Sequence, residues 1–206
     1  MSTQSITLEH GTFKSSNGYI AGHYNTSRLL KLVTSNEQIK ATVSLFNGDS
    51  SGTELEMQTS NRCASLLESA LDYMNDFAFS PIKSEVSLIS QTNAGGTFKV
   101  SARSSNSPIF LQYTEAPPTS ILTSNVTTSN GEALVKMHST FEGTFEVVTS
   151  NASSVLKASR GADGRRVIHQ RKVGSSIVGS VSWGERRRLR GSTSVRSSNG
   201  RVSLEV

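Results

Sequence analysis

A three-residue phrase, Ser/Thr-Ser/Thr-Asn, recurs along the chain and constrains its fold more than any other feature. The copies end at Asn17, Asn36, Asn61, Asn106, Asn125, Asn130, Asn151 and Asn199. Several gaps between them are about twenty residues, the length of one coil of a repeat protein or of one long hairpin. Asn and Gly adopt positive φ more readily than other residues, and Gly follows the phrase after Asn17, Asn130 and Asn199. The phrase therefore predicts a corner in the chain.

Apolar and polar residues alternate on either side of these corners. The alternation is clear in residues 39–45, 98–102, 133–137 and 202–206. A period of two is typical of a strand with one buried face. Only 34% of the residues are apolar, which fits a core that is one or two side chains across. Each unit is therefore expected to be a strand, a corner and a second strand.

These units predict an all-β fold, a single-domain β-solenoid over residues 1–206. Its structural corners are Asn17, Asn36, Asn106, Asn130, Asn151 and Asn199. Stacked coils would align these asparagines in a hydrogen-bonded row, which explains why the corners share one sequence. The alternative is a β-sandwich or meander, in which the Asn-Gly pairs form hairpin turns.

Two segments depart from the repeat. Residues 63–79 carry leucines at helical spacing, which predicts a short helix or an irregular coil. Residues 161–172 are rich in glycine and basic residues, which predicts an exposed basic loop.

Four segments carry a resemblance to known proteins. They are residues 139–145, 149–153, 178–185 and 196–200, which read STFEGTF, TSNAS, VGSVSWGE and RSSNG. Together they resemble a group of uncharacterised fungal proteins, which are similar in turn to bacterial proteins classed as adhesins and built as single-stranded right-handed β-helices. The similarity spans about residues 11–206, is strongest after residue 125, and is interrupted at 63–79. It implies a right-handed β-helix and an adhesin-like role.

No pattern typical of an enzyme is found, so we expect a non-enzymatic protein without catalytic residues, cofactor or metal. His10, His23, His138 and His169 are scattered, and we expect each at the surface, with His138 pointing outward from a strand. The single cysteine, Cys63, excludes an intrachain disulfide and a multi-cysteine metal site. No phosphate-binding glycine motif occurs.

A further hypothesis for the function, a carbohydrate-active β-helix enzyme, needs paired carboxylates on one groove. Glu54 and Glu56 are expected to share a strand face, as are Glu142 and Glu146. Trp183 is the only tryptophan, so clustered aromatics for sugar stacking are lacking. We expect these carboxylates to form charged strand faces instead.

Positive charge is concentrated near the C-terminal end. Residues 1–158 have a net charge of −3 and residues 159–206 a net charge of +8. The alternative function is accordingly a binding module for acidic ligands or nucleic acid. The scarcity of aromatics near the arginines disfavours nucleic acid. The expected contact residues are Arg165, Arg166, Arg186, Arg187, Arg188 and Arg190.

The repeat runs from Ile6 near one end to Val206 at the other, without a helix, proline or charged cap. Open strand edges recruit other strands. We therefore expect a homo-oligomer or filament formed through the end coils, in which the basic end of one copy attracts the acidic body of the next.

The expected location rests on segments that are lacking. No apolar run approaches the length of a membrane span. No secretory signal is visible, which favours the cytoplasm, with the cell surface by a non-classical route as the alternative. Glycosylation sequons occur at Asn25, Asn125 and Asn151. We attribute them to the recurrence of Ser, Thr and Asn in the corners, not to glycosylation.

Overall fold

The computed structural model describes residues 5–48, 52–60, 82–90, 95–158, 166–183 and 190–206. All regular structure in these ranges is β-strand, which confirms the all-β prediction. The segment 63–79 lies outside the described residues. The strands are β1 (Ser5–Ser15), β2 (Ile20–Thr34), β3 (Ile39–Asn47), β4 (Thr53–Thr59), β5 (Ile82–Ser90), β6 (Thr97–Ser104), β7 (Ile109–Glu115), β8 (Ile121–Thr128), β9 (Ala133–Lys136), β10 (Gly143–Thr149), β11 (Ser154–Lys157), β12 (Arg166–Val173), β13 (Ser176–Trp183), β14 (Gly191–Ser197) and β15 (Val202–Glu205).

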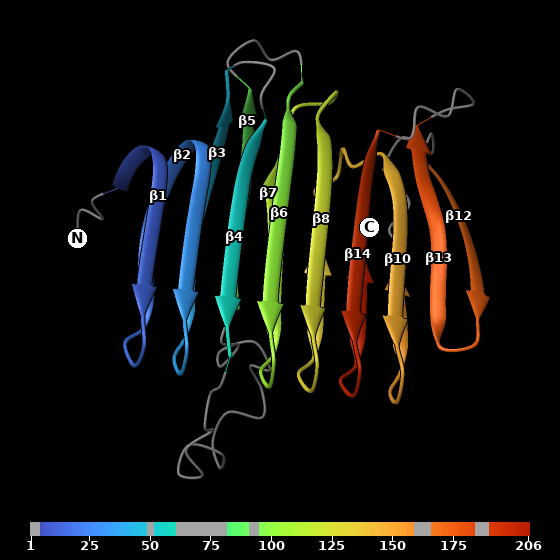
Figure 1. Ribbon diagram of the computed structural model, residues 1–206. Helices are drawn as coiled ribbons and strands as arrows, with labels where there is room; N and C mark the ends of the chain where they lie inside the picture. The colour runs from blue at the N-terminus through green and yellow to red at the C-terminus, as the bar shows by residue number, and fades with distance from the viewer. Residues whose placement is uncertain (1–4, 49–51, 61–81, 91–94, 159–165, 184–189) are drawn as a thin grey trace, which may run out of the picture.

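The strands form one open 15-stranded sheet that doubles back on itself at β2. Residues 20–26 of β2 pair with β3, and residues 29–34 pair with β4. Figure 1 shows the two layers that result. The front layer runs from the second half of β2 through β4, β6, β8, β14, β10, β13 and β12. The rear layer runs from the first half of β2 through β3, β5, β7, β9, β15 and β11.

Every second side chain fills the space between the layers. In β3, for example, Ile39, Ala41, Val43 and Leu45 are buried, while the residues between them are more exposed. The apolar sets of the segments 98–102, 133–137 and 202–206 are buried in the same way. Together they form one hydrophobic cluster. The four alternating segments predicted from the sequence are therefore confirmed as core strands.

Most neighbouring strands run parallel. Among the described pairs, only β10 with β13 and β12 with β13 are antiparallel. The two strands that flank an Asn corner lie in different layers, as β8 and β9 do, and pair with strands of other units. The hairpin turns of the meander alternative are therefore not formed at these corners.

Two local predictions are wrong. Arg166–Val173 forms β12, whereas a basic loop was expected over 161–172. The reason is its pairing with β13, from Arg166 opposite Trp183 to Val173 opposite Ser176, which forms a strand although only Ile168 of its apolar side chains packs, half-buried, on the core. Residues 161–165 lie outside the described ranges. The phrase at 123–125 lies within β8 and is therefore not a corner.

The last two strands do not follow the order of the sequence. We call two strands joined by one Ser/Thr-Asn corner a rung, and β14 with β15 is the last rung along the chain. β14 lies between β8 and β10, and β15 lies between β9 and β11. In Figure 1 the red β14 accordingly stands between the yellow β8 and the orange β10.

Candidate functional site

The corner asparagines hydrogen-bond to one another from rung to rung. Asn36 Nδ2 donates to Asn17 Oδ1 at 2.8 Å. Further along the stack, Asn130 donates to Asn106 at 2.7 Å, Asn199 to Asn130 at 2.6 Å, and Asn151 to Asn199 at 2.7 Å. Each amide donates with its nitrogen and accepts with its oxygen, so an identical residue above and below satisfies both ends. The six asparagines singled out in the sequence thus lie in two hydrogen-bonded groups, which we call the asparagine row.

A second row of hydroxyls lies inside the asparagine row. At several corners the first Ser or Thr of the phrase is buried and donates to a backbone carbonyl of the neighbouring corner. Thr34 donates to Gly18 O, Thr128 to Ser107 O, Ser197 to Gly131 O and Thr149 to Gly200 O. Some of the same hydroxyls also accept from the backbone N–H three residues on, as Thr128 does from Gly131. These bonds satisfy polar groups that the corner would otherwise bury without partners.

The glycines of the corners serve close packing. Gly18, Gly131 and Gly200 do not adopt positive φ, so the conformational reason predicted for them is wrong. A Cβ on Gly200 would overlap the carbonyl oxygen of Gly131, and one on Gly131 would overlap that of Ser107. Glycine is therefore required at Gly131 and Gly200, because these corners touch their neighbours backbone to backbone.

The outer surface of the front layer carries ion pairs that bridge neighbouring strands. Glu54 and Glu56 both line a shallow hollow over β2, β4, β6 and β8, so they share a face as predicted. Lys99 Nζ lies 2.6 Å from Glu54, and Lys31 Nζ lies 2.6 Å from Glu56. The hydrogen bond that Lys99 donates to Glu54, with the charge of the same carboxylate, raises the pKa of Lys99. Both carboxylates are thus held by lysines of adjacent strands.

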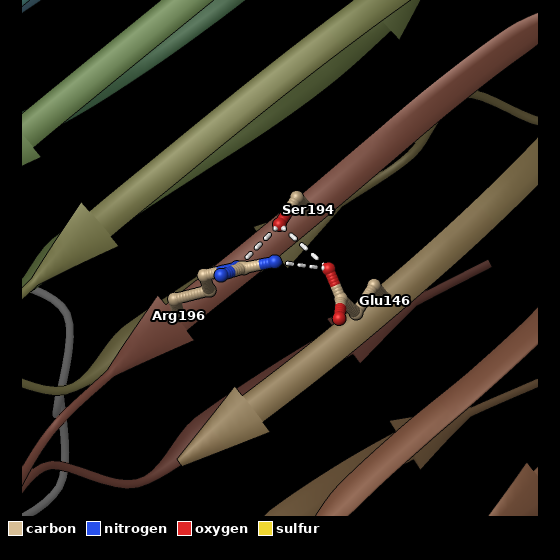
Figure 2. A network of polar contacts seen from close by, with 3 residues as sticks. All are labelled: Glu146, Ser194 and Arg196. Atoms are coloured by element: carbon tan, nitrogen blue, oxygen red, sulfur yellow. Dashed lines mark hydrogen bonds and ion pairs between the residues drawn. The ribbon is translucent and has the colours of Figure 1, made fainter.

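A third ion pair joins β14 to β10. Figure 2 shows Arg196 reaching across to Glu146. The closest atoms of the two side chains are 2.5 Å apart. Ser194 accepts from Arg196 Nε at 3.1 Å and donates to Glu146 at 3.4 Å. Glu142, the other half of the carboxylate pair considered above, instead accepts from the backbone N–H of Trp183. Each of the four carboxylates therefore already has an ion-pair or hydrogen-bond partner.

The predicted basic contact residues are only partly described. Arg166 begins β12, and Arg190 is half-buried just before β14. Arg165 and Arg186–Arg188 lie outside the described residues. Arg171 and Lys172 are exposed on β12, which is the last strand of the front layer. Basic side chains therefore lie at one end of the sheet.

His138 is buried, with 4% of its surface exposed, although it was expected to point outward. It follows β9 at the bend toward β10, where its Nδ1 lies 2.8 Å from Thr140 Oγ1 and its ring meets that of Phe141 edge-on. The strand period that predicted its direction ends at Lys136, which explains the error. Within the described ranges, no group of three or more His, Cys, Asp or Glu is placed to hold a metal ion.

The outermost strands have one paired edge each. Among the described residues, β1 pairs only with β2, β11 only with β15, and β12 only with β13. β1 places Leu8 and Phe13 half-buried on the core, and Ile6 is 45% exposed. The other end exposes Val167 and Val173 of β12. Both ends of the sheet thus offer backbone hydrogen-bonding groups beside apolar side chains.

Comparison of the chain with protein-family models, curated proteins and solved structures found no match in any of the three. In the part of the chain that the structure describes, no helix is long and apolar enough to cross a membrane.

Proposed function

We propose that this chain is a right-handed β-solenoid with a non-enzymatic, structural or adhesin-like role, and that copies associate end to end. The stacked corners and the parallel pairing of strands from different rungs support the solenoid. The resemblance to adhesin-like β-helices supports the handedness and the role. The observation that carries the proposal concerns β1, an 11-residue strand with apolar side chains. One edge of β1 pairs with β2, and its other edge pairs with no strand of the described ranges.

Strand direction supports a head-to-tail contact. The antiparallel hairpin β13–β12 returns the outermost front strand to the direction of β10, and hence to that of the front strands back to β1. β11 likewise runs parallel to the rear strands. A second copy can therefore continue the stack by placing its β1 against this end. The two surfaces differ, so the contact does not close on itself and can propagate.

The test is the size of the purified chain in dilute solution, measured by light scattering and viewed by electron microscopy. We expect species well above the 22.1 kDa of one chain. Ile6→Lys on β1 and Val167→Lys on β12 should each reduce this size, because a lysine at an edge disfavours strand pairing. Ile121→Lys is the matched control: Ile121 is also partly exposed, at 39%, but lies on the interior strand β8. A strict monomer at micromolar concentration would overturn the proposal.

The second candidate is a binding module for an acidic ligand at the basic end of the sheet. The exposed Arg171 and Lys172 on an outermost strand favour it. It predicts salt-sensitive retention on heparin that is lost when Arg186–Arg188 are replaced by alanine. Retention that is indifferent to salt or to this replacement would exclude it.

A further inference from the structure

The last rung fills an internal slot that the rest of the chain leaves open. The chain passes from β9 to β10 without occupying the position between β8 and β10, and it occupies this position only after forming β11, β12 and β13. β14 then pairs in parallel with β8 on one side and β10 on the other. β15 pairs in the same way with β9 and β11. Without residues 190–206, four strand edges would face a gap one strand wide.

The slot is specific for this one segment. Val195, Val202 and Leu204 are fully buried in it. Asn199 bridges Asn130 and Asn151, so it closes the asparagine row across the gap. A Cβ on Gly200 would overlap the carbonyl oxygen of Gly131, and a Cβ on Gly191 would lie 2.8 Å from the carbonyl oxygen of Leu122. From the other side, a Cβ on Gly143 would overlap the carbonyl oxygen of Gly191. A strand of another sequence would lack these glycines, so the fitting occupant is residues 190–206 of this chain or of a second copy.

We propose that the β14–β15 rung exchanges between two copies of this chain, each filling the slot of the other. An exchanged rung makes the same contacts as an unexchanged one, so protein concentration and the connecting segment decide between the two forms. Residues 184–190 make this connection. Seven extended residues reach roughly 23 Å, whereas crossing the single strand β10 needs only roughly 10 Å. The connection therefore has more residues than the path to the rung's own slot requires.

The exchange is tested by disulfide trapping in the full-length chain with Cys63→Ala. Asn125 of β8 and Ser194 of β14 are register partners and line the same surface hollow, so cysteines there are well placed to bond. One population carries Asn125→Cys and another, with a different tag, carries Ser194→Cys. The two are unfolded, refolded together at high concentration and oxidised. A cross-linked dimer bearing both tags is expected, because only an exchanged rung brings the thiol at position 194 of one copy beside the thiol at position 125 of the other.

The control pairs Ser194→Cys with Thr42→Cys on the rear strand β3, which measures collisional cross-linking. The expected yield of the 125–194 dimer exceeds the control by about tenfold, because adjacent register partners are held together. A yield equal to the control overturns exchange. The chain carrying both Asn125→Cys and Ser194→Cys shows whether the pair can bond, since its oxidation within one copy locks the rung in its own slot.

Exchange does not depend on end-to-end stacking. Adding Ile6→Lys to both populations weakens the end contact and should leave the 125–194 cross-link unchanged. A cross-link that disappears with Ile6→Lys assigns the dimer to the end contact and overturns exchange, whereas large assemblies without the cross-link support stacking alone.

Discussion

Tyr113 joins the two layers by a hydrogen bond through the core. Its hydroxyl, carried by β7, donates to Ser124 Oγ of β8 at 2.7 Å. The side chain is almost fully buried, and this burial raises the pKa of the phenol, while the bond to Ser124 lowers it in part. The sequence placed Ser124 within a recurrent phrase but held no local signal that a tyrosine eleven residues earlier would meet it. Such a contact depends on the packing of the layers.

Tyr113→Phe should lower the free energy of unfolding by about 1 kcal/mol at neutral pH, because the buried Ser124 loses its partner. It should also change the alkaline behaviour. The unfolded phenol ionises near its usual pKa of about 10, while the folded one stays protonated, so the native protein loses stability as the pH rises above that value. Urea unfolding between neutral and alkaline pH should show a shallower decline for the variant. An identical decline in both proteins would contradict the role of Tyr113.

Gly200→Ala tests the backbone contact between corners. The added methyl would overlap the carbonyl oxygen of Gly131. This oxygen is a backbone atom, so it cannot shift without moving the neighbouring corner. We expect a loss of about 3 kcal/mol in unfolding free energy, at the upper end for overpacking. Gly18→Ala is the matched control in an outer corner, where the new Cβ meets only the Ser15 hydroxyl at 2.8 Å. Equal losses measured by denaturant unfolding would show that conformation, not contact, selects glycine here.

At the scale of elements, the corner is the unit that the sequence predicts best. The alternation of apolar residues and the Ser/Thr-Asn phrase are local, and a strand's buried face follows from its period alone. The corner at 34–36 and its two flanking strands were accessible in this way. The strand β12 was not, because it is rich in basic residues and does not alternate apolar with polar side chains, and its pairing with β13 makes it a strand.

The asparagine row predicts that an interior corner matters more than an outer one. Asn130 bonds to both Asn106 and Asn199, whereas Asn17 accepts one bond from Asn36. Asn130→Ala should therefore cost about 1–2 kcal/mol, and Asn17→Ala about half as much, since an intramolecular hydrogen bond contributes about 1 kcal/mol. Thermal and urea unfolding of the two variants measures the difference. Equal effects would mean that the amides do not stabilise the stack.

At the scale of the whole molecule, the described rungs lie side by side in one open sheet, and the number of neighbours that a rung has determines its importance. An end rung has one neighbour, as β1 shows, while the β14–β15 rung has two. In a quasi-one-dimensional array, stability is a sum of rung and interface contributions. Removing an interior rung therefore costs two interfaces and leaves new edges exposed.

Two deletions compare these positions directly. Removing residues 190–206 withdraws Val195, Val202, Leu204 and Val206 from the core, a loss of roughly 6–12 kcal/mol at 1.5–3 kcal/mol per side chain. This matches the whole stability of a typical domain, so cooperative unfolding should disappear. Removing residues 1–18 takes away a half-exposed outer strand and should leave a cooperative transition, as measured by circular dichroism in urea. A cooperative transition in the first variant would contradict the interior role of the last rung.

For the candidate site, the sequence predicted individual residues but not their partners. Asn106, Asn130 and Asn199 were recognised from their shared phrase, and Glu54 and Glu56 from their spacing. The partners of these residues were not recognised: Lys99 is far from Glu54 in sequence, and Arg196 is far from Glu146. Each pair forms because parallel register sets one strand beside another.

Amino-acid order alone specified four core strands, the buried side of each and six of the corners, because these properties depend on neighbours within a few positions. It did not specify which corner stacks on which. All the corners carry nearly the same phrase, so Asn130 bonds as well to a corner 69 residues away as to the preceding one. The tertiary structure decides this order: the β12–β13 hairpin pairs with one edge of β10, and the last rung places β14 on its other edge.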